Sequence, residues 1–116
     1  MFKILIAHKK KAKLIGNIGK PMLSINTVSP STIFVIEASS YQIEYSQYFK
    51  TDYAIILNIS PDHLERHGNI KNYVRAKFKL INNQDKNSYS YIDRNNKHLE
   101  KEVSQKNFKC KLKKVK

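Results

Sequence analysis

The sequence has 116 residues, a mass of 13.6 kDa and a formal net charge of +13. This length accommodates one ordinary domain or a piece of a longer chain, and the 41% of apolar residues exclude a wholly disordered chain. A single cysteine excludes a disulfide scaffold and an all-cysteine metal site. No apolar run approaches the ~18 residues of a membrane helix, so we expect a soluble, cytoplasmic protein that does not contact a membrane.

The positive charge is concentrated at the two ends of the sequence. Five lysines lie in residues 1–13 and six in residues 104–116, and neither stretch contains an acid. These lysines supply eleven of the thirteen net charges, which leaves +2 for residues 14–103. A nucleic-acid-binding surface spreads its basic residues over a folded face. Codon bias from an AT-rich genome therefore explains the lysines better than nucleic-acid binding, which stays as a weaker alternative.

The first elements are short. Residues 2–10 begin with apolar side chains and favour a short helix, although their isoleucines also allow a strand. Residues 11–15 are typical of a strand that runs into a glycine turn. The segment GNIGKP at residues 16–21 is then expected to open a helix, because Pro21 suits a first helical turn.

Two later runs are rich in apolar, β-branched and aromatic residues, at residues 32–37 (TIFVIE) and 53–59 (YAIILNI). Such runs predict strands that are buried on both faces of a parallel sheet covered by helices. After the second run, Ser60 is a candidate N-cap, Pro61 suits the first helical position and Asp62 complements the helix dipole. We therefore expect a helix to start at Ser60.

The remaining elements follow the same alternation. Apolar residues at helical spacing predict a helix over residues 70–82. Residues 88–92 predict a third strand and residues 93–103 another helix. The alternation indicates an α/β fold with a partial, open, mostly parallel sheet and helices on both faces. We assign residues 1–103 to this domain and residues 104–116 to a lysine-rich stretch without a predicted element.

Polar residues follow both apolar runs, at the point where ligands bind in open parallel sheets. The first run ends at Glu37, and the second leads to His63. Because neighbouring parallel strands end at one edge of a sheet, we expect both side chains to face one crevice. A carboxylate and an imidazole can hold a divalent cation that carries phosphate oxygens. A solvated glutamate and a packed histidine are the alternative interpretation.

Several ordered motifs carry a family resemblance. They are VIEASSYQIE at residues 35–44, AIILNISPDHLERHG at 54–68 and NYVRAKFKLI at 72–81. Together they resemble the central, ATP-binding domain of a Mur ligase, over about residues 1–95. The upstream GNIGKP at residues 16–21 and the serine pair followed by an aromatic residue and glutamine are similar to the branch that adds D-glutamate. Another Mur ligase or a folylpolyglutamate synthase-like relative is the alternative.

The resemblance implies an ATP-dependent amide ligase of peptidoglycan synthesis. Its cofactors would be ATP and Mg²⁺, and it would act on a UDP-linked muramoyl substrate and D-glutamate. The carboxylate of the muramoyl substrate would take the γ-phosphate of ATP to form an acyl phosphate and ADP. The amine of D-glutamate would then attack the acyl carbon, and phosphate would leave. Metal ions and cationic groups would neutralise the charge of the anions that meet there.

The resemblance also implies roles for three residues at the reacting phosphate. Glu37 would be a ligand of a magnesium ion near the γ-phosphate, and His63 would be a ligand of a second magnesium ion. Lys77 matches the lysine that family members carbamylate, a change that turns a cation into a carboxylate-like anion able to orient magnesium. The alternative for Lys77 is an ordinary exposed lysine on a helix.

The same resemblance implies that Asn17, Ser39 and Ser40 bind substrate, with a turn residue and helix caps as the alternatives. The glycine-rich phosphate loop of the family, which ends in Gly-Lys-Ser/Thr, does not occur in the sequence. We also expect the flanking nucleotide-binding and D-glutamate-binding domains of the family to be absent. We therefore expect a piece of a ligase that is inactive by itself, with a non-catalytic fragment as the competing hypothesis.

Overall fold

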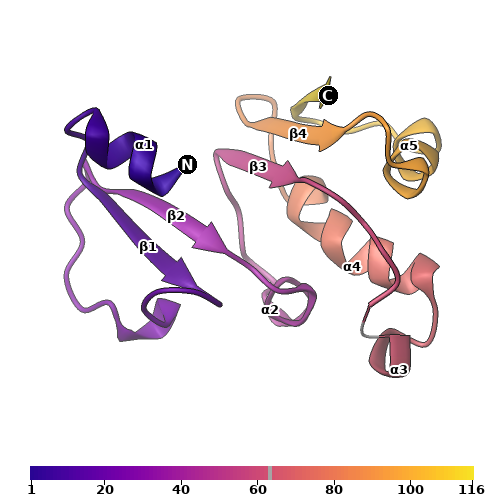
Figure 1. The fold of residues 1–116 in the computed structure, drawn as a ribbon, viewed down its shortest axis with the longest axis horizontal. Helices are drawn as coiled ribbons and strands as arrows, with labels where there is room; N and C mark the ends of the chain where they lie inside the picture. The colour runs from indigo at the N-terminus through magenta and orange to yellow at the C-terminus, as the bar shows by residue number, and fades with distance from the viewer. Residues whose placement is uncertain (63) are drawn as a thin grey trace. The chain divides into compact units, whose positions relative to one another are not determined.

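A computed structural model describes residues 1–62 and 64–116 of the chain. The chain divides into two compact units, Met1–Ser39 and Ser40–Lys116, each with its own parallel sheet (Figure 1). We call them the first unit and the second unit and describe each by itself. In the described residues, no helix is long and apolar enough to cross a membrane.

The first unit contains a helix, a two-stranded parallel sheet and one short 3₁₀ turn. The elements are α1 (Phe2–Ala7), β1 (Ala12–Gly16), η1 (Met22–Ser24) and β2 (Ile33–Glu37). The short helix and the strand that follows it are therefore confirmed. Strands β1 and β2 are in parallel register from Ala12 opposite Ile33 to Gly16 opposite Glu37, so both strands end at the same edge.

The prediction of a helix after the glycine turn is wrong, because only a three-residue 3₁₀ turn forms there. Pro21 is the N-cap of a single 3₁₀ turn, and Ile25 already has an extended backbone. The residues beyond it include the β-branched Thr27 and Val28 and then Pro30. Because these residue types disfavour a continuing helix, the first helical turn is not extended.

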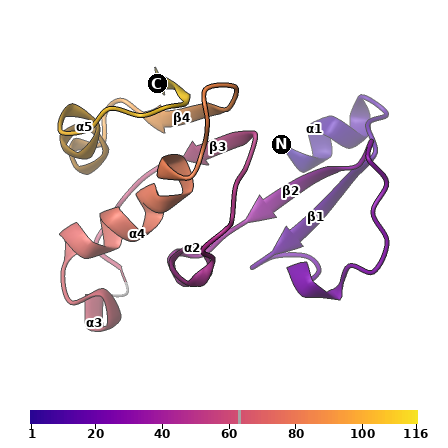
Figure 2. The ribbon, with the colours of Figure 1, turned by 180° about the vertical axis from the view of Figure 1, so that it is seen from behind.

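The second unit alternates strands and helices. Its elements are α2 (Ser40–Tyr45), β3 (Tyr53–Ile56), α3 (Leu64–His67), α4 (Ile70–Asn82), β4 (Tyr89–Asp93), α5 (Lys97–Ser104) and β5 (Lys111–Val115). The three strands form one parallel sheet in the order β3-β4-β5. Helix α4 runs alongside β3 and β4, as Figure 2 shows from behind. The α/β class and the parallel direction of the strands are confirmed. The expectation that the runs 32–37 and 53–59 are neighbours in one sheet is wrong, because β2 pairs with β1 and β3 pairs with β4.

The helix boundaries differ in how well the sequence predicts them. Helix α4 matches the predicted residues 70–82, and the Asn69 side chain accepts a hydrogen bond from the Asn72 amide at its start. The predicted start at Ser60 is wrong, because the described helix begins at Leu64. Helix α5 starts later than predicted, since Asn96 caps it and Asp93 still belongs to β4.

The prediction that both apolar runs are buried on two faces is wrong. In β3, Ala54 and Ile56 are buried whereas Tyr53 and Ile55 are exposed. Strand β2 is only half-buried along its length, and Ile33 is exposed. A strand is buried on both faces only where layers cover both faces.

The core of the second unit lies between α4, α5 and the sheet. Helix α4 contributes side chains at helical spacing, which therefore share one face. The side chains of this core that are almost completely buried are Phe78, Ile81, Ile92 and Leu99.

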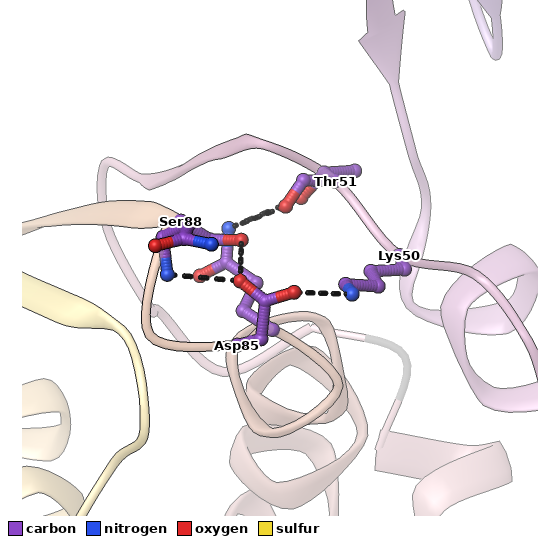
Figure 3. A network of polar contacts seen from close by, with 6 residues as sticks. Lys50, Thr51, Asp85 and Ser88 are labelled. Carbon is purple, nitrogen blue, oxygen red and sulfur yellow. Dashed lines mark hydrogen bonds and ion pairs between the residues drawn. The ribbon is translucent and has the colours of Figure 1, made fainter.

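A polar network ties the chain before β3 to the end of α4 (Figure 3). The Lys50 ammonium lies 2.5 Å from an Asp85 carboxylate oxygen, and the Gln84 amide donates to the Thr51 carbonyl over 2.9 Å. The hydrogen bond from Lys50 and one from the Asn87 backbone amide hold the pKa of Asp85 below its ordinary value. The network therefore stabilises the ionised carboxylate of Asp85.

Candidate functional site

The end of the two-stranded sheet brings two candidate residues together. Gly16, the last residue of β1, has a φ of +106° and lies opposite Glu37 in the register. An added Cβ at Gly16 would collide with the Glu37 carbonyl oxygen, so glycine allows this close approach. The next residue, Asn17, donates its backbone amide to the same carbonyl over 2.8 Å. Asn17 and Glu37 therefore meet at the carboxyl edge of β1 and β2.

Both side chains at this edge are open to solvent. The Glu37 carboxylate offers oxygen ligands, which Mg²⁺ prefers, and Mg²⁺ keeps several waters when one or two carboxylates bind it. A solvent-open carboxylate at a strand end fits that requirement. In the described residues, no group of three or more histidine, cysteine or acidic side chains could hold a metal ion by itself. Glu37 can accordingly supply only part of a cation site.

In the second unit, Ser40 begins α2 and is buried, with 3% of its surface exposed. Its hydroxyl oxygen lies 3.0 Å from Nε2 of His67, the last residue of α3. His67 is also buried, and its ring stacks on Tyr41 with 5.5 Å between the ring centroids. The burial and this hydrogen bond favour a structural role of Ser40 over direct contact with substrate.

Charged groups of α3 lie near the Tyr41 ring. The Arg66 guanidinium lies over this ring at 4.8 Å from its centroid. Burial raises the pKa of the Tyr41 phenol, and the nearby Glu65 carboxylate raises it further. Tyr41 is therefore neutral at physiological pH and acts as an aromatic surface.

Lys77 lies on α4, one turn after Tyr73. Its ammonium nitrogen is 5.0 Å from the centroid of the Tyr73 ring, an arrangement that attracts a cation to an aromatic face. Tyr73 is buried and its ring is tilted against His67, with 5.3 Å between the ring centroids. Lys77 is half-buried rather than fully exposed, so the structure gives this lysine a defined position.

The remaining predicted site residues are Ser39 and His63. Ser39 is half-buried and has an interaction partner. His63 lies outside the described residues. Asn17 and Glu37 belong to the first unit, whereas Ser40 and Lys77 belong to the second. The predicted metal site shared by Glu37, His63 and Lys77 therefore stays a prediction.

The sequence indicates no role for His67, although the structure places it in contact with Ser40, Tyr41 and Tyr73. Its contacts come from residues that are distant in sequence, such as Ser40, which is 27 residues away. The one available signal was the pair of histidines in HLERHG, which are four residues apart and share a helical face if the helix includes both.

Comparison with known proteins decides the family. A sequence profile of the Mur ligase middle domain matches residues 3–115. The chain belongs to this family. The resemblance inferred from the motifs is thereby confirmed, and the match extends through β5, beyond the residues that carry the motifs.

Three curated relatives of this Mur ligase middle domain carry the name UDP-N-acetylmuramoylalanine–D-glutamate ligase. The protein of Caldicellulosiruptor saccharolyticus is 48% identical over 82 residues, which cover 70% of this chain and 18% of the relative. That of Wolbachia pipientis is 42% identical over 82 residues, 71% of this chain and 16% of the relative. That of Elusimicrobium minutum is 39% identical over 104 residues, 89% of this chain and 23% of the relative. The chain thus spans about a fifth of the length of these relatives.

Proposed function

We propose that this chain is part of an ATP-dependent ligase that joins D-glutamate to UDP-N-acetylmuramoylalanine in peptidoglycan synthesis. The observation that carries the proposal is the identity of 39–48% to relatives that are named for this activity. The chain's own GNIGKP motif and its serine pair support the same branch. Because the chain spans about a fifth of these relatives, the proposal concerns the complete protein to which such a segment belongs.

In this proposal, the Glu37 carboxylate and the carbamate formed on Lys77 bind magnesium, and His63 is a ligand of a second magnesium ion. Bound magnesium would neutralise phosphate charge and align the transfer from ATP to the substrate carboxylate. The exposed carboxylate of Glu37 supports its role, because it is open to a hydrated cation. A carbamate and a carboxylate are both oxygen ligands, as magnesium requires.

The substrate side of the site is proposed at the turn after β1. Asn17 is exposed and its backbone is tied to the strand end that carries Glu37. An amide side chain at this point can hydrogen-bond to an anionic substrate. Ser39 is the second candidate, because it directly follows the strand end, and the buried Ser40 would act through the fold.

A chimera tests the proposed function. The matching segment of the Elusimicrobium minutum ligase is replaced by that of this chain, and release of ADP is measured with each substrate left out in turn. We expect ADP release that requires both UDP-N-acetylmuramoylalanine and D-glutamate. The unmodified ligase is the positive control, and the chimera with Glu37→Gln is the matched negative control.

Two results would contradict the proposal. A folded chimera without activity, beside an active parent, would favour a non-catalytic segment. An activity that accepts a different amino acid in place of D-glutamate would favour another member of the Mur ligase family.

A further inference from the structure

The second unit contains a buried histidine that the proposed reaction does not use. The His67 ring lies between Tyr41 and Tyr73, with centroid distances of 5.5 Å and 5.3 Å. These rings come from α2 and α4, whereas His67 ends α3. His67 therefore connects three helices, of which α4 carries Lys77.

The two ring nitrogens of His67 face different partners. Nδ1 lies 3.9 Å from a carboxylate oxygen of Glu44, and Nε2 lies 3.0 Å from the Ser40 hydroxyl oxygen. Only the distance between Nε2 and the Ser40 hydroxyl oxygen is within hydrogen-bonding reach. Which of these two atoms donates depends on the tautomer of the ring. In either tautomer this hydrogen bond orients the ring.

The order Ser40, His67, Glu44 is that of a nucleophilic triad, but the geometry excludes this use. The Ser40 side chain is buried, so its hydroxyl offers no surface on which a substrate could bind. The distance between His67 and Glu44 also exceeds hydrogen-bonding reach. The group therefore acts on its surroundings within the fold rather than on a bound molecule.

The Tyr73 ring connects His67 to Lys77, a residue of the proposed site. Tyr73 and Lys77 are one helical turn apart on α4, and the ammonium nitrogen lies 5.0 Å from the Tyr73 ring centroid. The same ring is tilted by 51° against His67. A rotation or shift of His67 would release the Tyr73 ring, and the surface on which the lysine lies would move with it.

We propose that His67 is a positioning residue for Lys77. It is held by the Ser40 hydroxyl and holds the Tyr73 ring in the orientation on which Lys77 lies. This inference rests on the proposed function, in which Lys77 serves at the reacting phosphate. A reactant group must be held within a few tenths of an ångström to be effective, and a flexible four-carbon side chain needs such support.

The first test measures the Lys77 side chain directly in the full 116-residue chain. Nuclear magnetic resonance with ¹³C-labelled lysine reports the ring-current shift that Tyr73 imposes on the methylene next to the Lys77 amine. His67→Phe keeps a flat ring but removes the hydrogen bond to Ser40. We expect this variant and Ser40→Ala to reduce the shift, whereas His98→Phe, a matched change on α5, leaves it unchanged. An unaltered Lys77 signal in His67→Phe would overturn the proposal.

The second test separates positioning from stability in the active chimera. His67→Phe should lower kcat about tenfold, the effect of one hydrogen bond, with little change in the KM for D-glutamate. His67→Gln should restore most of the kcat, because the glutamine amide can form a hydrogen bond with the Ser40 hydroxyl. The double variant Ser40→Ala/His67→Phe removes both polar partners, so its melting temperature should recover while its kcat stays low.

The outcomes of the two tests are distinguishable. Recovery of kcat together with the melting temperature in the double variant would show a merely structural residue and overturn the proposal. An inactive chimera with unmodified His67 would count against the proposed function alone, because the Lys77 resonance still decides whether His67 positions that side chain.

Discussion

The two units of the chain differ in how much core they bury. Among residues 1–39, all of which the structure describes, Ile15 is the one hydrophobic side chain that is buried. The second unit packs α4 and α5 against a three-stranded sheet around Phe78, Ile92 and Leu99, none of which reaches solvent. Burial of apolar area is the main favourable term in folding. The second unit can therefore hold its fold by its own contacts, and the first unit has much less to hold it.

This difference matters for the proposed site, because each unit carries a part of it. Glu37 and Asn17 lie on the weakly packed unit, where backbone hydrogen bonds and a glycine fix the strand ends. Lys77 lies on α4 one turn from Tyr73 and one turn from Ile81, which both belong to the core of the second unit. We therefore expect the position of Lys77 to be sensitive to changes in core packing. The position of Glu37 should depend instead on the backbone geometry of the strand ends.

The largest effect should come from the core of the second unit. Phe78→Ala removes a side chain with 0% exposure and should lower the free energy of unfolding by about 3–5 kcal/mol. The matched change in the first unit is Leu23→Ala, where the side chain is 99% exposed and the expected effect is within about 0.5 kcal/mol. Residue-resolved amide exchange measures both, since it reports the stability of each unit separately. Similar losses in the two variants would contradict the comparison.

The next effect concerns the two parts of the proposed site in the active chimera. Glu37→Gln and Lys77→Ala should each lower kcat about 100-fold, the typical cost of removing a group that stabilises charge in the transition state. Short carboxylates added to Lys77→Ala should restore part of the rate by replacing the carbamate. Lys71→Ala, which removes an exposed lysine from the same helix, is the control and should keep the activity. A normal kcat in either site variant would remove that residue from the proposed role.

The elements that the sequence predicts best are those set by local spacing. Helix α4 matches its predicted limits because its apolar residues repeat at helical spacing and Asn69 caps its start. The strands are also found, since runs such as TIFVIE contain the residue types that favour strands. The family motifs predict the fold, which is confirmed, and candidate site residues, whose roles stay a prediction.

Features that depend on distant partners were missed. Burial on both faces was expected for β3, but burial is decided by what covers a strand and not by its composition. The bond between Ser40 and His67 joins residues 27 positions apart, so no local pattern predicts it. Ser60 has the residue type of an N-cap, yet the described helix starts at Leu64. Cap residues also favour turns and loops, which explains this error.

A pair of glycines compares the two units at the level of the backbone. Gly16 in the first unit and Gly68 in the second both have positive φ values, of +106° and +76°. A methyl group at Gly16 would collide with the Glu37 carbonyl, whereas one at Gly68 meets nothing within 4 Å. Gly68→Ala should therefore cost only the backbone strain, about 1–2 kcal/mol, and Gly16→Ala should cost more and shift the Asn17 and Glu37 amide resonances. Equal losses in the two variants would show that the close approach at Gly16 is not needed.

The smallest effect should be a dependence of the second unit on acid. Asp85 has a lowered pKa because Lys50 and the Asn87 amide bind its ionised form. A group whose pKa is lower in the folded state binds fewer protons there than in the unfolded state, so its contribution to stability rises with pH. That contribution is complete above the ordinary aspartate value of 3.8, and it is lost as the pH falls through the lower, folded value. Both side chains are about half exposed, so solvent screens the pair and the effect is small.

The variants that test this pair differ only in which charge they remove. Asp85→Asn keeps an acceptor oxygen for the Asn87 amide but removes the titrating charge. It should therefore flatten the fall in unfolding free energy below pH 4, while costing little at neutral pH. Lys50→Ala removes the partner of Asp85 and should also reduce the fall in unfolding free energy below pH 4. Lys86→Ala removes an exposed lysine that is next to Asp85 in the sequence, and it should leave this fall unchanged. Denaturant unfolding at several pH values measures all three, and an acid response in Asp85→Asn as steep as in the unmodified chain would assign the acid sensitivity to other carboxylates.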